Sequence, residues 1–317
     1  PKGYQRIGCH IIFAVKHDLR RKARFVANGC MTTIPKDSSY SSVVSLRGFR
    51  LALFIAELNK LDIWATDTTA AYLEAYTSER VYFGAGKELG GLEGHYLIIS
   101  KALYGLRSCG ARFRDRLILS LRQLKFFQCQ MEQDIWLRDC GDHYEYICVW
   151  VDDLAICSRD PQAIIDVLSD PKGEHKYQFK GTGPIEYHLG GNFYRDPDGT
   201  LVYSAETYVN KMIDQYERTF HEQPIEVNCP LRPDDHPELD MTPELDQKGI
   251  EQYQSLIGGF QWAISLVRFD IHVSTMTLGR FRIAPREGHL ERAKRIVGYL
   301  KRHPDAAIRF RTEIPDY

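Results

Sequence analysis

Two adjacent aspartates, Asp152 and Asp153, are the residues of this chain that point most directly to chemistry. They lie between two apolar runs within residues 145–158, and this pattern predicts a hairpin with both acids at its tip. A two-residue hairpin turn prefers Asn-Gly or Asp-Gly, and two like charges beside an apolar sheet repel each other and are poorly solvated. A hard divalent cation removes these objections, because carboxylate oxygens are its natural ligands. For the hairpin alone, a solvated turn that holds two acids is the other interpretation.

Asp67 is a third acid, and it ends another short apolar strand, residues 63–66. Acids at strand ends that meet across a sheet form a two-metal site. One ion then activates an attacking hydroxyl, and the other neutralises a triphosphate and its leaving group. Taken alone, Asp67 would more often be a strand-end or helix-cap acid. The three aspartates together indicate a site for metal-dependent nucleotidyl or phosphoryl chemistry.

Several elements must position these acids. Residues 8–26 alternate around a polar turn and predict a hairpin, and residues 43–60 carry apolar positions at helical spacing. A Gly-rich loop is expected at 84–94, and an amphipathic helix after Gly110, with these apolar positions on one face: Phe113, Leu117, Leu121 and Leu124. Another helix is expected at 163–169, followed by strands through residues 193 and 200–203.

The character of the sequence changes after residue 204. Apolar positions from Val209 to Phe220 predict a helix with Ser204 as its N-cap. Residues 221–248 hold five prolines and many acids, and we expect a linker or extended arm there. Three further helices are expected at 251–267, 271–283 and 287–302. The sequence therefore predicts an α+β protein whose first part is mixed and whose last part is all-α.

Composition and the start of the chain add further expectations. With 44% hydrophobic and 26% charged residues in 317, the chain is typical of a globular protein of one large domain or several subdomains, and no apolar run is long enough to span a membrane. Its eight cysteines form no C-x-x-C pair, and we find no histidines at zinc-like spacing from them, so reduced core thiols of an intracellular protein are expected. Pro1 begins the chain without a signal region, as in a fragment of a longer protein.

The net charge of −1 hides an uneven distribution. Residues 1–60 carry eleven Lys/Arg against three acids, residues 280–302 eight against two, and residues 217–251 ten acids against three bases. Two basic ends could form a groove for nucleic acid, and a set of solvated helix faces is the equally weighted alternative.

Seven segments carry a resemblance to a known family. The chain resembles the reverse-transcriptase region of copia-type (Pseudoviridae) LTR retrotransposon polyproteins over nearly all of its 317 residues. Any one segment is a weak match, but their order and separations are family-like. The segments are 22–27 (KARFVA), 67–73 (DTTAAYL), 101–107 (KALYGLR), 150–154 (WVDDL), 187–191 (YHLGG), 253–258 (YQSLIG) and 293–300 (AKRIVGYL).

The resemblance implies a right-hand polymerase fold and an RNA-directed DNA polymerase. Residues 1–62 would be the N-terminal part of the fingers, 63–203 a palm with an antiparallel sheet and the rest of the fingers, and 204–317 a helical thumb and connection. The three aspartates would be catalytic and would bind two Mg²⁺ ions, for which Mn²⁺ can substitute. The implied partners are dNTPs and an RNA or DNA template with its primer. RNase H and integrase regions are expected elsewhere in a longer polyprotein. The protein is expected inside the cell, in a cytoplasmic virus-like particle and in the nucleus.

The resemblance also implies a nucleotide-binding group. Tyr72 lies where reverse transcriptases keep an aromatic gate against the 2′-OH of ribonucleotides. Lys16 and Arg24, on the hairpin, are candidates to grip the triphosphate. Gly105 would let the backbone approach the nucleotide or template, and Lys180 is a candidate general acid for pyrophosphate. A core tyrosine, exposed hairpin cations, a turn glycine and a surface lysine are the respective alternatives.

Two further sets would contact nucleic acid. Residues 187–191 would form a primer grip that includes Tyr187, Leu189 and Gly190, although Leu189-Gly190 could simply start a strand. The basic face of helix 287–302 could follow a duplex backbone, or be only solvated. Its candidate residues are Arg292, Lys294 and Arg295.

The chain departs from the family pattern at three places. Ser108-Cys109 follow the YGLR segment, where the family usually has Gln, so a nucleotide contact there is in doubt. Trp150 replaces the common Tyr, and Arg268-Phe269-Asp270 replaces Arg-Pro-Asp. A catalytically inactive, domesticated remnant that binds nucleic acid or a protein partner is the main alternative function. A two-metal phosphodiesterase using the same acids is another.

Overall fold

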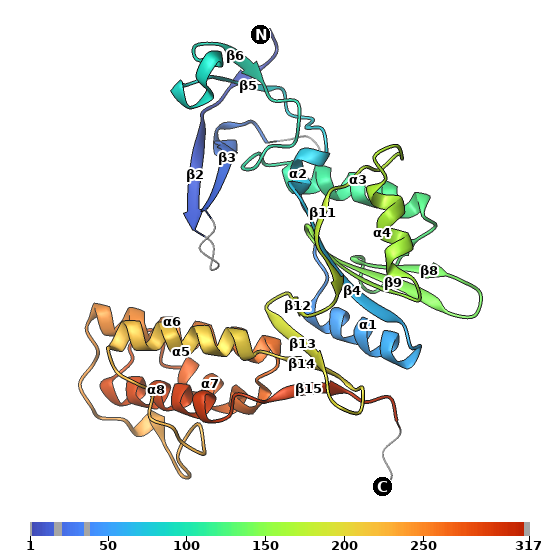
Figure 1. Ribbon diagram of the computed structural model, residues 1–317. Helices are drawn as coiled ribbons and strands as arrows, with labels where there is room; N and C mark the ends of the chain where they lie inside the picture. The colour runs from blue at the N-terminus through green and yellow to red at the C-terminus, as the bar shows by residue number, and fades with distance from the viewer. Residues whose placement is uncertain (1, 16–20, 35–38, 314–317) are drawn as a thin grey trace. The chain divides into compact units, whose positions relative to one another are not determined.

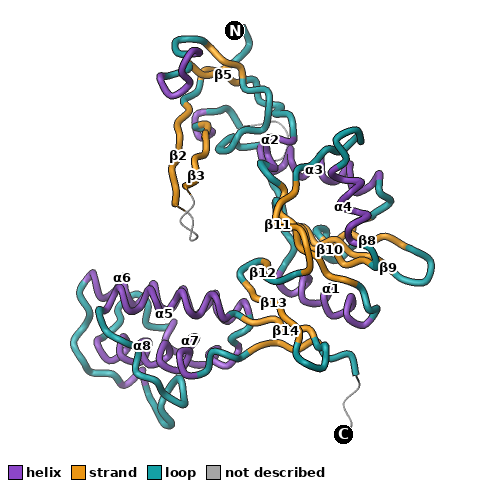
Figure 2. The backbone as a smooth tube through the Cα atoms, viewed as in Figure 1, coloured by secondary structure: helices purple, strands orange, loops and turns teal. Residues whose placement is uncertain are grey.

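The computed structural model describes residues 2–15, 21–34 and 39–313. The chain divides into two compact units, Pro1–Pro184 and Ile185–Tyr317, each of which mixes helices with antiparallel sheet. Figure 1 shows the chain by residue number, and Figure 2 shows the same backbone by secondary structure. The mixed α+β class expected from the sequence is confirmed. The boundary at Pro184 means that residues 185–203, which the sequence grouped with the palm, lie in the second unit.

A six-stranded sheet forms the centre of the first unit, and all its neighbouring strands are antiparallel. The two apolar runs within residues 145–158 form its two central strands, as predicted. The strand order is β11 (Phe179–Pro184), β4 (Asp62–Thr68), β10 (Asp153–Ser158), β9 (Tyr144–Trp150), β8 (Ile135–Asp139) and β7 (Phe127–Gln128).

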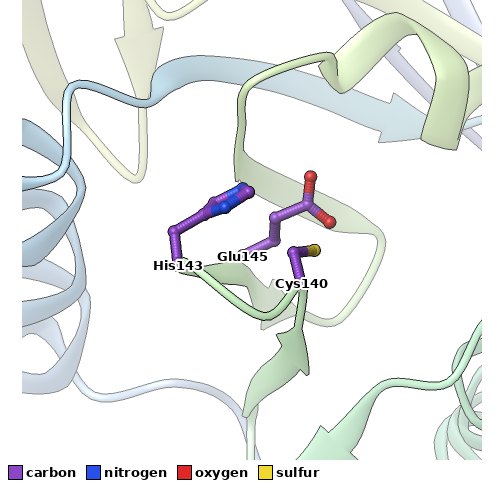
Figure 3. A group of neighbouring side chains, drawn as sticks. All are labelled: Cys140, His143 and Glu145. Atoms are coloured by element: carbon purple, nitrogen blue, oxygen red, sulfur yellow. The ribbon is translucent and has the colours of Figure 1, made fainter.

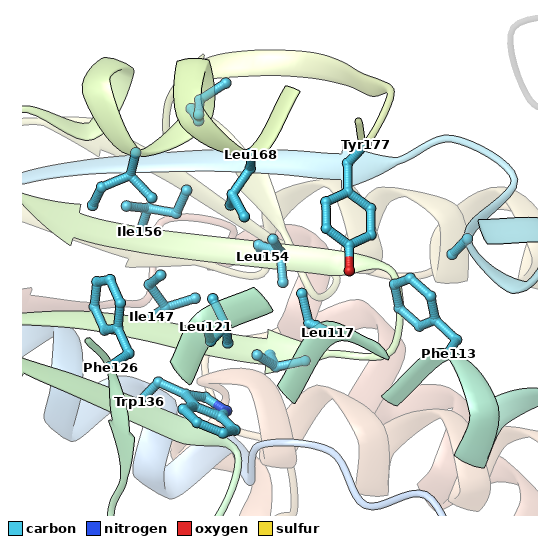
Figure 4. Packing of buried hydrophobic residues seen from close by; sticks show 14 residues of the cluster. Phe113, Leu117, Leu121, Phe126, Trp136, Ile147, Leu154, Ile156, Leu168 and Tyr177 are labelled. Carbon is cyan, nitrogen blue, oxygen red and sulfur yellow. The ribbon is translucent and has the colours of Figure 1, made fainter. Parts of the chain in front are cut away.

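Helices cover both faces of this sheet. On one face, α3 (Cys109–Gln123) and α4 (Pro161–Ser169) pack with Leu154 and Ile156 of β10 in a buried cluster (Figure 4). Because side chains alternate along a strand, Ala155 and Cys157 face the other side. There α1 (Leu46–Leu58) packs against β4, β9 and β10. The small side chains allow the helix to approach closely, and this packing holds the strands that carry the three aspartates.

The rest of the first unit consists of a hairpin and a small sheet. The hairpin joins β2 (Cys9–Val15) to β3 (Arg21–Ala27), close to the range predicted from the sequence. In the small sheet, β5 (Val81–Gly84) pairs in parallel with β1 (Gln5–Arg6) and antiparallel with β6 (Tyr96–Ile98). Ile7, Ala27, Val81, Phe83, Ile99 and Leu106 form their common core. The Gly-rich stretch expected as a loop contains a 3-10 helix, Lys87–Leu92.

Over residues 185–313, the second unit combines a four-stranded sheet with four α-helices. The sheet order is β12 (Tyr187–His188), β13 (Gly191–Arg195), β14 (Leu201–Ser204) and β15 (Ala307–Phe310). The helices are α5 (Glu206–Phe220), α6 (Gln247–Leu266), α7 (His272–Gly279) and α8 (Glu287–Arg302). The expectation of an all-α last part was wrong, because β15 returns to pair with β14. Strand β15 has only four residues, of which one is buried, and this is too short a pattern to be recognised as a strand from the sequence.

Helices α1, α4 and α6 start with an ordinary side-chain N-cap. Ser45 accepts a hydrogen bond from the backbone N–H of Gly48 and caps α1, and Asp246 does the same for α6 through Gly249. The N-cap of α5 is Ala205, without a side-chain cap, so the prediction of Ser204 was wrong. Ser204 is instead the last residue of β14, where its backbone pairs with Ala307 and Asn192.

Candidate functional site

Strand pairing brings the three aspartates together. Asp153 is the cross-strand partner of Asp67 in the antiparallel pair β10–β4, and Asp152 precedes it in the chain. The backbone N–H of Thr68 donates to the carbonyl oxygen of Asp152 at 2.8 Å, so the turn before β10 is fixed to the end of β4. The sequence had placed both Asp152 and Asp153 at the hairpin tip. In the structure Asp153 begins β10, and only Asp152 lies in the turn.

The turn residues are Val151 and Asp152, because Trp150 pairs with Asp153. Val151 has φ +55°, in the left-handed region that a β-branched residue rarely adopts. Strain of about 1–3 kcal/mol is typical of such a residue and is found mainly at functional sites. The tight turn therefore places Asp152 beside the Asp67–Asp153 pair at the expense of strain in Val151.

Burial and mutual repulsion shape the electrostatics of the cluster. Burial raises the pKa of Asp153 to about 6, and the neighbouring carboxylates of Asp152 and Asp67 add to the shift. Burial also raises the pKa of Asp152, again with a contribution from Asp67. Carboxylates that are partly desolvated and close to one another favour a bound cation. Three carboxylates from adjoining strands are a donor set that fits Mg²⁺ or Mn²⁺.

Lys180 belongs to this cluster. It is the β11 partner of Asp67, and its Nζ lies 2.6 Å from Oδ1 of that aspartate. Its positive charge also lowers the pKa of Asp152 and Asp153, against the larger effect of burial. A cation on the same oxygen of Asp67 would require Lys180 to release it. The ammonium would then be close to any phosphate held there.

Two tyrosines line the region next to the carboxylates. Tyr72 lies in the short helix α2 (Ala71–Glu74), and its ring centroid is 4.8 Å from that of Tyr104. The Arg24 guanidinium of β3 lies over the other ring, 5.9 Å from the Tyr104 centroid. Burial raises the pKa of Tyr72 and of Tyr104, and the charge of Asp152 contributes to both shifts. Arg24, Tyr104 and Tyr72 therefore form a row that borders the aspartates.

Tyr104 was not among the residues singled out from the sequence. The signal was present, because it directly precedes Gly105 in the segment KALYGLR. Its place beside the site is recognised only in the structure, where β3 and α2, which are distant in sequence, bring Arg24 and Tyr72 into contact with the Tyr104 ring.

Gly105 has a structural reason to be glycine. Its φ is +89°, and a Cβ at this position would clash with the carbonyl oxygen of Ala27 and with the Val26 side chain. The backbone of residues 104–105 therefore lies directly against β3, and the N–H of Ala27 donates to the Tyr104 carbonyl oxygen at 2.8 Å. The close approach seen here is to the protein's own strand. A role toward nucleotide stays a prediction.

The predicted primer-grip residues form a hairpin in the second unit. Leu189 and Gly190 are the two turn residues between β12 and β13, with φ of +50° and +88°. Two successive positive φ values are the geometry of a tight hairpin turn. Tyr187 is half exposed, and Lys211 of α5 lies over its ring at 6.0 Å. The residues are presented together on one hairpin, and the alternative that Leu189-Gly190 starts a strand was wrong.

The basic residues of α8 have partners within the chain. Arg292 pairs with Asp235 at 2.9 Å and with Asp240 at 2.5 Å, and Lys294 pairs with Glu222 and Glu291. Arg295 donates to the Cys229 carbonyl oxygen at 3.1 Å. The acidic segment 221–246 therefore lies against α8 and offsets much of its charge. A contact of these side chains with nucleic acid stays a prediction, and Lys16 lies outside the described residues.

The raised pKa of Asp153 predicts a pH-dependent change of stability. Its folded-state pKa of about 6 lies above the ordinary value of 3.8. The folded state therefore binds more protons, and the free energy of unfolding falls as pH rises from about 4 to about 6. Without divalent cations, Asp153→Asn should be more stable than wild type by about 1–2 kcal/mol at pH 7.5, after allowance for solvent screening. The gain should vanish near pH 4.

Urea unfolding in EDTA across this pH range measures the effect. Asp166→Asn on the exposed face of α4 is the matched control, and it should change stability by less than about 0.5 kcal/mol. A stability gain in Asp153→Asn that is equal at pH 4 and pH 7.5 would contradict the assigned cause.

Comparison with known proteins agrees with this geometry. Residues 1–227 match the family model described as Reverse transcriptase (RNA-dependent DNA polymerase), and the chain belongs to that family. It is 26% identical over 317 residues to the retrovirus-related Pol polyprotein from transposon RE1 of Arabidopsis thaliana. The matched region covers 97% of this chain and 21% of that polyprotein. The resemblance to copia-type retrotransposon Pol polyproteins is thereby confirmed.

Two yeast relatives extend the comparison. A transposon Ty5-1 protein of Saccharomyces cerevisiae is 28% identical over 213 residues, 66% of each chain. The transposon Ty1-DR1 Gag-Pol polyprotein of the same organism is 24% identical over 318 residues, 93% of this chain and 17% of that polyprotein. The chain thus spans about a fifth of the polyproteins it matches. Within the described ranges, no helix is both long enough and apolar enough to cross a membrane.

Proposed function

We propose that this chain is an RNA-directed DNA polymerase that adds dNMPs to a primer 3′ end. The observation that carries the proposal is the cross-strand pairing of Asp67 with Asp153, next to Asp152 in a strained turn. Membership of the reverse transcriptase family supports the same reaction. Because the chain spans only part of its polyprotein relatives, its activity, template and partners are part of this proposal.

The three aspartates would hold two Mg²⁺ ions, or Mn²⁺ in their place. Bound there, the ions would help the primer 3′ hydroxyl to attack and would neutralise the triphosphate. Lys180 would leave Asp67 and place its ammonium near the phosphates, where it is suited to protonate pyrophosphate. Arg24 would bind the triphosphate through its planar guanidinium, and Tyr104 would support Arg24 from below its side chain. Tyr72 would limit the space at the sugar.

The proposed architecture is a right hand with fingers in residues 1–62, a palm in 63–203 and a helical thumb and connection in 204–317. Tyr187, Leu189 and Gly190 would grip the primer, and Gly105 would lie near the nucleotide. Arg292 and Lys294 would contact the backbone of the duplex after exchanging their acidic partners, and Arg295 after releasing the Cys229 carbonyl oxygen. RNase H and integrase regions would lie elsewhere in a longer Pol polyprotein. The protein would be located in a cytoplasmic particle and in the nucleus.

Primer extension by the 317-residue chain tests the function. A DNA primer annealed to an RNA template, with dNTPs and Mg²⁺, should be extended to the template end. A folded chain that incorporates no dNMP would reject the polymerase. If that chain still binds the primer–template, it is an inactive nucleic-acid-binding remnant. Cleavage of nucleic acid without dNTPs would instead indicate a phosphodiesterase.

The gate role of Tyr72 predicts a change in sugar selectivity. Removing the ring in Tyr72→Ala opens the space between Tyr104 and the aspartates, so ribonucleotides should be accepted more readily. The ratio of kcat/KM for rNTP over dNTP should rise at least about tenfold, which corresponds to about 1.4 kcal/mol. Tyr72→Phe should keep wild-type selectivity. Tyr76→Ala, four residues further and exposed, is the matched control. Unchanged selectivity in Tyr72→Ala would reject the gate.

A further inference from the structure

The hairpin between β8 and β9 gathers three side chains that ligate metals. Cys140 and His143 lie in the loop, and Glu145 lies at the start of β9. The Cys140 Sγ, one ring nitrogen of His143 and one carboxylate oxygen of Glu145 all lie within 4.8 Å of one another. Figure 3 shows the thiol and the carboxylate next to each other, with the nitrogen-bearing edge of the imidazole directed toward the carboxylate. A small displacement would bring all three onto one ion.

His143 provides a second, independent indication of a ligand. Its side chain is only 8% exposed, and its Nδ1 lies 2.7 Å from Oδ1 of Asp142, whose other oxygen pairs with Arg159 at 2.8 Å. Its Nε2 is buried and has no hydrogen-bond partner in the described part of the chain. An unpaired buried polar atom is unfavourable. A carboxylate on Nδ1 is the usual partner of a metal-bound imidazole, because it fixes the ring and the tautomer with a free Nε2.

The surroundings of Glu145 also suit a ligand. Its buried carboxylate accepts hydrogen bonds from Ser158 Oγ at 2.5 Å and from Arg138 Nε at 2.7 Å. Arg138 Nη2 also lies 2.5 Å from Oε2, so the remaining acceptor position is on Oε1, since each oxygen of an ionised carboxylate accepts about two hydrogen bonds. Ser158 and Arg138 come from β10 and β8, so the carboxylate is held from both neighbouring strands. Ligating carboxylates are themselves commonly hydrogen-bonded in this way.

We propose that Cys140, His143 and Glu145 form a binding site for a divalent transition metal of the zinc type. A sulfur, an imidazole nitrogen and a carboxylate oxygen suit Zn²⁺ or Co²⁺ rather than Mg²⁺, and three protein ligands leave a fourth position for water. Binding converts the Cys140 thiol to a thiolate and releases its proton to solvent. The thiolate and Glu145 then balance the two charges of the ion.

The site corrects an expectation drawn from the sequence. No zinc-like spacing of histidine and cysteine was expected, but Cys140 and His143 are separated by two residues. The third ligand follows from the strand, which turns Glu145 to the same side of the hairpin. The bound ion would fasten the loop to β8 and β9, at the end of β9 opposite to the turn that carries Asp152.

Cobalt titration of the reduced, EDTA-treated 317-residue chain tests the proposal. One equivalent of Co²⁺ should give a thiolate-to-metal charge-transfer band, and Zn²⁺ should abolish the band by displacement. The aspartate cluster has only oxygen ligands and cannot give this band. Cys140→Ser and His143→Ala should each lose it. Cys30→Ser, a substitution of another exposed cysteine, should retain it.

Thermal unfolding gives a readout that is independent of colour and of polymerase activity. Zn²⁺ should raise the Tm of the wild type and of Cys30→Ser, because an ion that binds only the folded state stabilises it. It should leave the Tm of Cys140→Ser unchanged. A folded wild type without a thiolate-dependent band at one equivalent of Co²⁺ would overturn the proposal. A band that persists in Cys140→Ser would do the same, and would assign the signal to another cysteine.

Discussion

Asp152→Asn is expected to lower the rate of primer extension at least about a thousandfold while the protein remains folded. A carboxylate that helps to hold a catalytic cation contributes several kcal/mol to the transition state, and about 4 kcal/mol corresponds to a factor of about a thousand. The amide keeps the shape of the side chain but loses its charge. The backbone carbonyl of residue 152 can still accept its hydrogen bond from Thr68, so the turn should persist.

The measurement compares single-nucleotide incorporation under single-turnover conditions with Mg²⁺. Asp166→Asn is the matched control, because it removes an exposed carboxylate on α4 that accepts a local hydrogen bond from Gln162 of the same helix. Its activity should equal that of the wild type. Burial raises the pKa of Asp152, so its replacement by a neutral side chain should not lower stability. An Asp152→Asn protein with more than about a tenth of wild-type activity would remove this residue from the metal site.

Arg268→Ala is expected to destabilise the second unit by about 2–5 kcal/mol, mainly because it empties a buried site. Arg268 is fully buried at the end of α6, and its guanidinium donates to both oxygens of Asp270, from Nε at 3.0 Å and from Nη2 at 2.7 Å. It also lies over the Tyr299 ring of α8 at 5.9 Å. Removing it leaves a cavity, and the partly exposed Asp270 carboxylate loses its cationic partner; the cavity is the larger of these two losses in the free energy of unfolding.

Urea unfolding measures this loss of stability. The control is Arg218→Ala, at an exposed position of α5, and it should change the free energy of unfolding by less than about 0.5 kcal/mol. Arg268→Met combined with Asp270→Asn should recover part of the loss, because it removes the unpaired charge and refills the space. Equal stabilities of Arg268→Ala and wild type would show that the Arg268 side chain contributes nothing net.

Features that depend on neighbouring residues were predictable from the sequence. Helix α1 and the hairpin β9–β10 follow from apolar spacing and apolar runs. Asp67 and the two aspartates of the hairpin were expected to come together across a sheet, and Asp67 pairs with Asp153. The exact turn was not predictable, since it depends on how far the pairing continues. One further paired position moves Asp153 from the turn into the strand, and leaves Val151 with the positive φ that was expected of an aspartate.

Features that depend on distant residues were not predictable. Strand β15 is recognisable only beside β14, and the row of Arg24, Tyr104 and Tyr72 exists only because three separate segments meet. The sequence indicated a basic helix and an acidic segment. It could not show that the acidic segment folds against the basic helix, because this depends on the path of the proline-containing backbone between α5 and α6.

The path of segment 221–246 along α8 makes its acidic side chains counterions of the helix that belong to the same chain. Binding of a duplex to free cations releases condensed salt ions, and the affinity then falls steeply with salt concentration. At Arg292 and Lys294, phosphates would instead replace Asp235, Asp240 and Glu222, which cannot diffuse away. Each such exchange trades one anion for another. Binding through α8 would therefore depend less on salt than its number of positive charges implies, and the segment would compete with nucleic acid as a built-in polyanion.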